Sequence, residues 1–151
     1  NIGANKLRRA QEGVKVSMYM SFAITLTLTL LVNVFAEQIL SLFTQEAEVL
    51  KYGAEFVHVI SPFYCVMIIY QIHSGALRGA GIVRTPVLIM LGSFVAFRQV
   101  YLFVMAKFIA NEVIPIGMGY PAGWLVCSVL TFVYYKRANL SRNRLVADAA
   151  R

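Results

Sequence analysis

Long apolar runs are the feature that most limits what this chain can fold into. Three runs of 21, 22 and 23 residues contain no Asp, Glu, Lys or Arg, and they cover residues 16–36, 56–77 and 113–135. Each reaches the roughly 20 residues that a helix needs to cross a hydrocarbon core of about 30 Å. Charged residues make up only 14% of the chain, too few to coat a water-soluble surface. The chain is therefore predicted to be an all-α membrane protein.

A fourth apolar run, residues 87–108, is interrupted near its centre by Arg98. Its twelve Leu, Ile, Val and Phe residues favour insertion by about −4 to −7 kcal/mol as an upper bound. One central Arg costs about 2.5–3.5 kcal/mol, so the net free energy still favours insertion into the membrane. Four transmembrane helices are predicted, separated by segments 1–15, 37–55, 78–86, 109–112 and a tail, 136–151. Segment 37–55 is expected to hold an outer loop and the start of the second helix, with Thr44 as its N-cap.

The charges of the connecting segments alternate from one crossing to the next. Eleven basic residues fall on one side of the membrane: Lys6, Arg8, Arg9, Lys15, Arg78, Arg84, Lys136, Arg137, Arg142, Arg144 and Arg151. The other side has only Lys51 and Lys107, together with five glutamates. The positive-inside rule places the eleven in the cytoplasm. This predicts a multi-pass protein of a bacterial cytoplasmic (inner) membrane, with the lipid bilayer as its main partner.

Several other classes of function are disfavoured. The net charge is +7, but no basic stripe is interleaved with aromatic residues, so nucleic-acid binding is not expected. Cys65 and Cys127 lie within apolar runs without CxxC spacing, which argues against a disulfide framework and a metal site. No nucleophile–base pair or carboxylate pair indicates an enzyme, and no cofactor is expected. Because the chain begins without Met, we expect it to be truncated at its N-terminus.

The first apolar run carries small polar residues at intervals of four, namely Ser17, Ser21, Thr25, Thr29 and Asn33. Each step of four turns the track by about 40° around a helix, so it stays continuous as it winds. Such a track forms either the wall of a polar cavity or a set of hydrogen bonds that joins neighbouring helices. The sequence leaves both interpretations open.

The second apolar run gathers polar and adaptable side chains on one helical face: Tyr64, Met67, Gln71, Ser74, Gly75 and Arg78. Met and Tyr can repack around differently shaped organic molecules, although ordinary helix packing uses the same residues. We take Tyr64, Met67, Gln71, Ser74 and the intramembrane Arg98 as candidates for a substrate cavity.

Three further features are singled out. His73 could exchange a proton near neutral pH, which makes it a weak candidate for a proton relay; a hydrogen-bonded structural histidine is the alternative. Arg98 needs an acidic partner, a backbone carbonyl or a wet cavity. The GxxxG spacings of Gly75 with Gly79 and of Gly119 with Gly123 favour close contacts between helices.

Three stretches of the sequence carry a resemblance to one protein family. The chain opens with Asn1-Ile2-Gly3-Ala4, followed by a basic run. The second apolar run ends in Gly75-Ala76-Leu77-Arg78-Gly79-Ala80-Gly81, with Arg84-Thr85-Pro86 after it, and Arg98 lies in the next run. Together these stretches resemble the C-terminal lobe of multidrug and toxic compound extrusion (MATE) transporters. The first is similar to a cytoplasmic loop of that family, the second resembles its "GALRGxGxxRTP" segment, and Arg98 resembles an Arg of the following helix in many bacterial members.

The resemblance implies a twelve-helix transporter of two lobes, of which this chain would supply the last four helices. The implied function is multidrug efflux of cationic, amphipathic compounds in exchange for Na⁺ or H⁺ by alternating access. The implied partners are small organic cations and the missing N-terminal lobe with the remaining helices of the same transporter. Some members carry an acidic residue for the coupling cation near the position of Met67, and this neighbourhood is apolar here. No coupling-ion site is therefore identifiable in these residues.

Two alternatives remain open at this point. One is a lipid-linked oligosaccharide flippase of the same superfamily, which would carry more intramembrane basic residues than Arg98 alone. The other is a four-helix membrane subunit that transports nothing. The number of membrane helices in the complete reading frame distinguishes the second alternative from a twelve-helix transporter.

Overall fold

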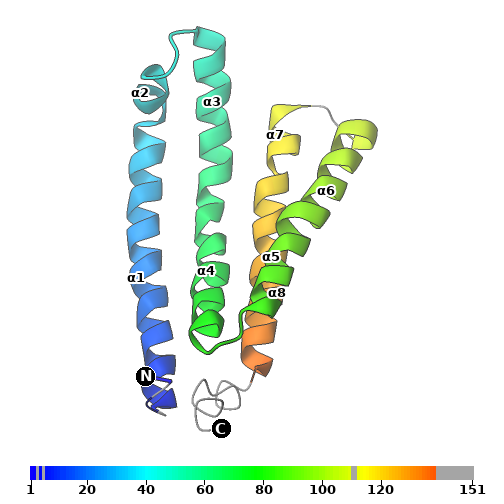
Figure 1. The fold of residues 1–151 in the computed structure, drawn as a ribbon. Coiled ribbons are helices and arrows are strands. Elements are labelled where there is room, and N and C mark those ends of the chain that lie inside the picture. The colour runs from blue at the N-terminus through cyan, green and yellow to red at the C-terminus, as the bar shows by residue number, and fades with distance from the viewer. Residues whose placement is uncertain (3, 5, 110–111, 139–151) are drawn as a thin grey trace.

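The protein is built of helices joined by short connections (Figure 1). The computed structural model describes residues 1–2, 4, 6–109 and 112–138. Four helices are long and apolar enough to cross a membrane: Leu7–Val34, Ala47–Gly79, Arg84–Ile109 and Val113–Arg137. Even the shortest, at 25 residues, extends about 37 Å at a rise of 1.5 Å per residue. The predicted all-α membrane fold with four spanning helices is confirmed.

Most of the spanning helices consist of several segments. The first is α1 (Leu7–Val34), which is followed by the short α2 (Ala36–Ser41). The second comprises α3 (Ala47–Ile60), η1 (Ser61–Phe63) and α4 (Tyr64–Gly79). The third comprises α5 (Arg84–Leu91), η2 (Gly92–Phe97), α6 (Arg98–Val104) and η3 (Met105–Ile109). The fourth comprises α7 (Val113–Gly117) and α8 (Gly119–Arg137).

The break within the second span has a local cause. Pro62 has no N–H to donate and its ring blocks the preceding turn, so the chain passes through a 3₁₀ turn at η1. The third helix contains two π-helical turns, η2 and η3, which the sequence pattern did not predict. The first of these begins at Gly92 and ends next to Arg98.

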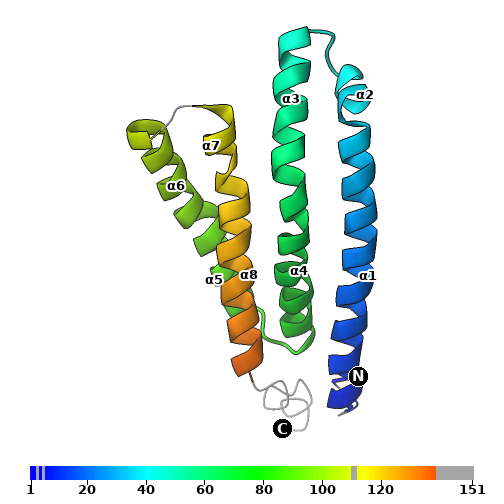
Figure 2. The same ribbon diagram turned by 180° about the vertical axis from the view of Figure 1, so that it is seen from behind.

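The second and fourth spans form the centre of the structure (Figures 1 and 2). Helix α4 packs along α8, α1 packs against α4, and the third span packs against α8. The start of α1, the end of α4, the start of α5 and the end of α8 lie at one end of the bundle. These are the ends that carry the basic residues, so the structure agrees with the alternation of charge along the sequence.

Small residues allow the close packing of the fourth span. A Cβ on Gly123 would lie 3.4 Å from the carbonyl oxygen of Ser93, and one on Gly119 would lie 3.0 Å from the Tyr101 ring. The close contact predicted from the spacing of Gly119 and Gly123 is therefore found. The corresponding prediction for Gly75 and Gly79 is wrong for the described residues, because a Cβ at either position meets nothing within 4 Å. Both glycines lie on an exposed face of α4.

The helices extend beyond the apolar runs from which they were predicted. Helix α1 begins at Leu7, within the segment 1–15 expected as a loop, and the Arg8–Glu12 ion pair of 3.0 Å links successive turns there. Segment 37–55 contains α2 and the first part of α3. The N-cap of α3 is Glu46 rather than Thr44. Thr44 instead accepts a hydrogen bond of 3.2 Å from the Glu46 N–H, which forms a turn ahead of the helix.

The connection between α4 and α5 is shorter than the predicted 78–86, because α4 continues to Gly79 and α5 begins at Arg84. Gly81 takes a φ of 81°, in the left-handed region that favours glycine. The Ile82 N–H donates to the Leu77 carbonyl and the Gly81 N–H to the Arg78 carbonyl, at 2.9 and 3.0 Å. This is a Schellman motif. It gives the glycine-rich segment a structural role at the end of α4.

Candidate functional site

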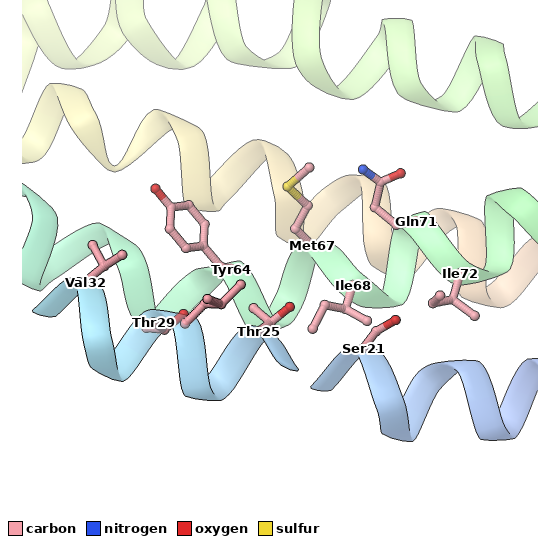
Figure 3. Close-up of a pocket in the computed structure, with 10 residues that line it drawn as sticks. Ser21, Thr25, Thr29, Val32, Tyr64, Met67, Ile68, Gln71 and Ile72 are labelled. Carbon is pink, nitrogen blue, oxygen red and sulfur yellow. The ribbon is translucent and has the colours of Figure 1, made fainter. Parts of the chain in front are cut away.

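A cavity of about 540 Å³ lies between α1 and α4. It is lined from α1 by hydroxyl groups of the polar track and from α4 by three of the predicted cavity residues (Figure 3). The lining residues are Ser21, Thr25, Leu28, Thr29, Val32, Tyr64, Met67, Ile68, Gln71 and Ile72. The close-up shows Tyr64, Met67 and Gln71 in a row along α4, while Ser21, Thr25 and Thr29 follow α1. The two polar helix faces predicted separately from the sequence thus contribute to one site.

The lining suits molecules with both apolar and polar parts. Four aliphatic side chains, Leu28, Val32, Ile68 and Ile72, supply apolar surface. Thr29 is only 7% exposed, and its hydroxyl has no hydrogen-bond partner among the described residues. A buried hydroxyl without a hydrogen-bond partner raises the free energy of the folded protein, and a hydrogen bond to a polar group of a ligand would lower it again. Tyr64 and Gln71 are exposed, so the cavity is accessible from one side.

One end of the polar track fastens α1 to the second span instead of lining the cavity. The Asn33 side-chain amide donates to the Ser61 hydroxyl at 2.6 Å and to the Thr29 carbonyl at 2.7 Å. The His58 Nε2 lies 3.0 Å from the Asn33 carbonyl oxygen, to which it donates. The other end, Ser17, is exposed and does not line the cavity. The two interpretations of the polar track therefore apply to different parts of it. Ser21, Thr25 and Thr29 line the cavity, and Asn33 joins α1 to the second span.

Ser74 and Arg98, the other two candidates, do not line this cavity. Ser74 is 3% exposed. The Arg98 guanidinium carbon lies 3.7 Å from the centroid of the Tyr120 ring, a cation–π contact. Its Nε is buried and has no hydrogen-bond partner among the described residues. Within the part of the chain that the structure describes, the only ion pair is Arg8–Glu12, so the charge of Arg98 is met there by an aromatic face.

A row of aromatic rings connects Arg98 to the cavity. Tyr120 packs against Trp124 with ring centroids 6.2 Å apart, and Trp124 packs against Tyr64 at 5.4 Å. Sequence reasoning missed Tyr120 and Trp124. Their spacing of four places both on one face of a helix, but only the tertiary arrangement shows that Arg98 and Tyr64 lie at the two ends of this row.

His73 lies on another face of α4, away from the cavity. It is 6% exposed, and its Nδ1 donates to the Ile69 carbonyl at 2.6 Å. Its ring meets the Phe132 and Tyr135 rings edge-on, at centroid distances of 5.2 and 4.7 Å. These are the contacts of a packed, hydrogen-bonded histidine. Its proposed role in a proton relay stays a prediction.

Residues that could hold a cation by carboxylate, imidazole or thiolate groups are scattered. No group of three or more His, Cys, Asp or Glu side chains comes together among residues 1–2, 4, 6–109 and 112–138.

Comparison with known proteins agrees with this arrangement. The MatE family model matches residues 1–104. The "Probable multidrug resistance protein YoeA" of Bacillus subtilis is 29% identical over 136 residues, which cover 90% of this chain and 29% of that protein. The "Probable multidrug resistance protein NorM" of Thermotoga maritima is 25% identical over 138 residues, covering 87% of this chain and 30% of that protein. The chain thus spans about three tenths of the length of these relatives. No solved structure gives a significant match.

Proposed function

This chain belongs to the MatE family, and from that premise we propose that it forms the C-terminal part of a multidrug efflux transporter. The transporter would export cationic, amphipathic organic compounds in exchange for Na⁺ or H⁺ by alternating access. The names of the two relatives, both probable multidrug resistance proteins, support the drug-export part of this proposal.

The observation that carries the proposal is the cavity between α1 and α4. Its apolar lining can hold a hydrophobic scaffold, while Gln71, Tyr64 and Thr29 offer polar groups. Met67 and the Tyr64 ring can adjust to ligands of different shape, as a transporter with several substrates requires. An organic cation can also lie against the face of an aromatic ring. The exposed ring of Tyr64 provides such a face in the lining of the cavity.

The complete transporter would need residues beyond this chain. Alternating access requires two halves that move around a central site, so we propose that the missing N-terminal lobe completes the cavity. The acidic group that binds the coupling Na⁺ or H⁺ would also come from outside this chain. We place the protein in a bacterial cytoplasmic membrane, because its basic connections are the ones expected in the cytoplasm. We propose no enzymatic reaction.

The proposal is tested by expressing the complete protein in a bacterium that lacks its major drug exporters. Cells loaded with a fluorescent cationic dye should lose the dye more rapidly than cells without the protein. The loss should stop when the Na⁺ or H⁺ gradient is collapsed. If no dye of a broad cationic panel is exported in a gradient-dependent way, the proposal is wrong.

The cavity itself is tested by Gln71→Ala. Removing the amide should change the ranking of exported dyes, with uptake or export of individual compounds altered about 3- to 10-fold, the worth of one hydrogen bond. Val129→Ala is the matched control, since Val129 is an exposed residue of α8 that lies outside the cavity. Equal effects of the two substitutions would remove Gln71 from the cavity.

A further inference from the structure

A second cavity, of about 890 Å³, lies between α1 and α8 at the basic end of the bundle. It has no part in the proposed drug site and shares no lining residue with it. One wall is formed by α1 residues that include Lys15, Met18 and Phe22, and the other by α8 residues that include Phe132, Lys136 and Arg137. We call it the basic groove.

The charges of the basic groove lie at the end nearest the membrane surface. Lys15, Lys136 and Arg137 line it and are exposed. The set of described residues that lines the groove contains no Asp or Glu. Glu12, the acidic residue nearest in sequence to Lys15, pairs with Arg8. The groove therefore presents three positive charges to whatever enters it, which favours an anion and disfavours the organic cations proposed as cargo.

The inner part of the groove is apolar. Met18 and Phe22 follow Lys15 along the same helix, the latter about 10 Å further toward the middle of the membrane at 1.5 Å per residue. Phe132 faces them from α8, one turn before Lys136. The Lys136 ammonium lies 5.5 Å from the centroid of the Phe132 ring, so charged rim and apolar wall are directly adjacent. The ring of His73 closes the groove behind Phe132 and Tyr135.

A charged rim followed by an apolar wall along the membrane normal fits one class of ligand. A phospholipid with a net negative headgroup has its phosphate at the interface and its acyl chains in the hydrocarbon region. Basic pockets between transmembrane helices bind such headgroups. A soluble phosphate could use the rim but not the apolar wall. We infer that the basic groove binds an anionic phospholipid, with its phosphate against Lys15, Lys136 and Arg137 and an acyl chain along Met18, Phe22 and Phe132.

The inference is tested on the purified full-length protein by native mass spectrometry. Phosphatidylglycerol and phosphatidylcholine with identical acyl chains are added in equal amounts, and the lipid that stays bound is counted. The wild-type protein should retain phosphatidylglycerol in preference. K136Q/R137Q should reduce this preference about fivefold for each charge removed, since one basic residue near an anionic surface contributes about that factor.

A matched double variant, R9Q/R78Q, removes two charges at the same end of the bundle outside the groove. It should keep the preference of the wild type. Met18→Trp, which fills the apolar part and leaves every charge in place, should lower retention of phosphatidylglycerol. Glycerol 1-phosphate, a headgroup without chains, should not displace the lipid.

Three results would overturn the inference. One is equal retention of the two lipids by the wild type, as expected if another segment of the transporter fills the groove. Another is an equal loss of preference in K136Q/R137Q and R9Q/R78Q, which would indicate a general electrostatic effect. The third is displacement by glycerol 1-phosphate at low concentration, which would assign the rim to a soluble anion. None of these results depends on whether the protein exports drugs.

Discussion

Asn33 joins two helices through a single side chain. Its amide bonds both the Ser61 hydroxyl and the Thr29 carbonyl, at 2.6 and 2.7 Å. Ser61 is 1% exposed, so its hydroxyl depends on this partner. In lipid the apolar surfaces of helices gain little from contact with one another, and specific polar contacts contribute more to helix association. Asn33 is therefore expected to stabilise the position of α1 and of the cavity wall that α1 supplies.

Asn33→Ala should destabilise the full-length protein by about 1 kcal/mol, because the Ser61 hydroxyl loses its partner. The measurement is the denaturation midpoint in detergent. Thr27→Ala is the control, since it removes only a local hydrogen bond to Ala23 on an exposed face. In a double-mutant cycle, N33A and S61A should be non-additive. Strict additivity would mean that the two side chains do not interact.

Arg98 is stabilised by the Tyr120 ring in a way that charge counting could not predict. Two substitutions of Tyr120 separate the effect of its ring from that of its phenol oxygen. Tyr120→Phe keeps the ring and should leave stability nearly unchanged. Tyr120→Leu removes the cation–π contact and should cost about 0.5–2 kcal/mol, the range from exposed to desolvated pairs. The same denaturation measurement checks both, and similar stabilities for the two variants would contradict a cation–π role.

At the scale of the elements, the end of α4 is determined by its backbone. Gly81 has a positive φ, and the Schellman bonds of Gly81 and Ile82 depend on it. Leu77 and Ile82, which the motif brings together, are both buried. The turn thereby determines where the chain leaves α4 and enters α5. Gly75 and Gly79 of the same segment carry no such constraint, because both lie in open space.

Gly81→Ala should therefore lower the free energy of unfolding of the full-length protein by about 1 kcal/mol, the cost of a left-handed conformation for a residue with a Cβ. Gly81→Asn should cost less, since Asn tolerates this region better. Thermal denaturation of the two variants in detergent gives the comparison. If Ala and Asn are equally tolerated, the turn is not under this conformational constraint.

The elements also show which features a sequence can predict. Spanning helices follow from hydropathy, because transfer into lipid is summed over one continuous run and does not depend on neighbours. The face that joins Tyr64, Met67 and Gln71 follows from helical spacing alone. The row from Arg98 through Tyr120 and Trp124 does not follow, because it depends on how separate helices meet. Ser74 was assigned to the cavity face but lies outside the cavity for the same reason.

At the scale of the whole molecule, the helices are covered unequally. Only 6% of the most apolar stretch of α1 is buried, whereas 33% of the corresponding stretch of the fourth span is buried. The remaining surface of α1 needs lipid or other parts of a longer protein around it. This agrees with the length of the relatives, of which the chain spans about three tenths.

The orientation of the molecule in the membrane is predicted from its charges. The two ends of the bundle differ in charge, and the positive-inside rule assigns the basic end to the cytoplasm. In the full-length protein with Cys65 and Cys127 replaced by Ala, single cysteines can be placed at Glu46 and Val83, which are both exposed and lie in connections at opposite ends. A membrane-impermeant thiol reagent applied to whole cells should label the cysteine at 46. It should label the one at 83 only after the membrane is opened. The reverse pattern would show that the basic end faces outward, and the cytoplasmic assignment made from the positive-inside rule would then be wrong.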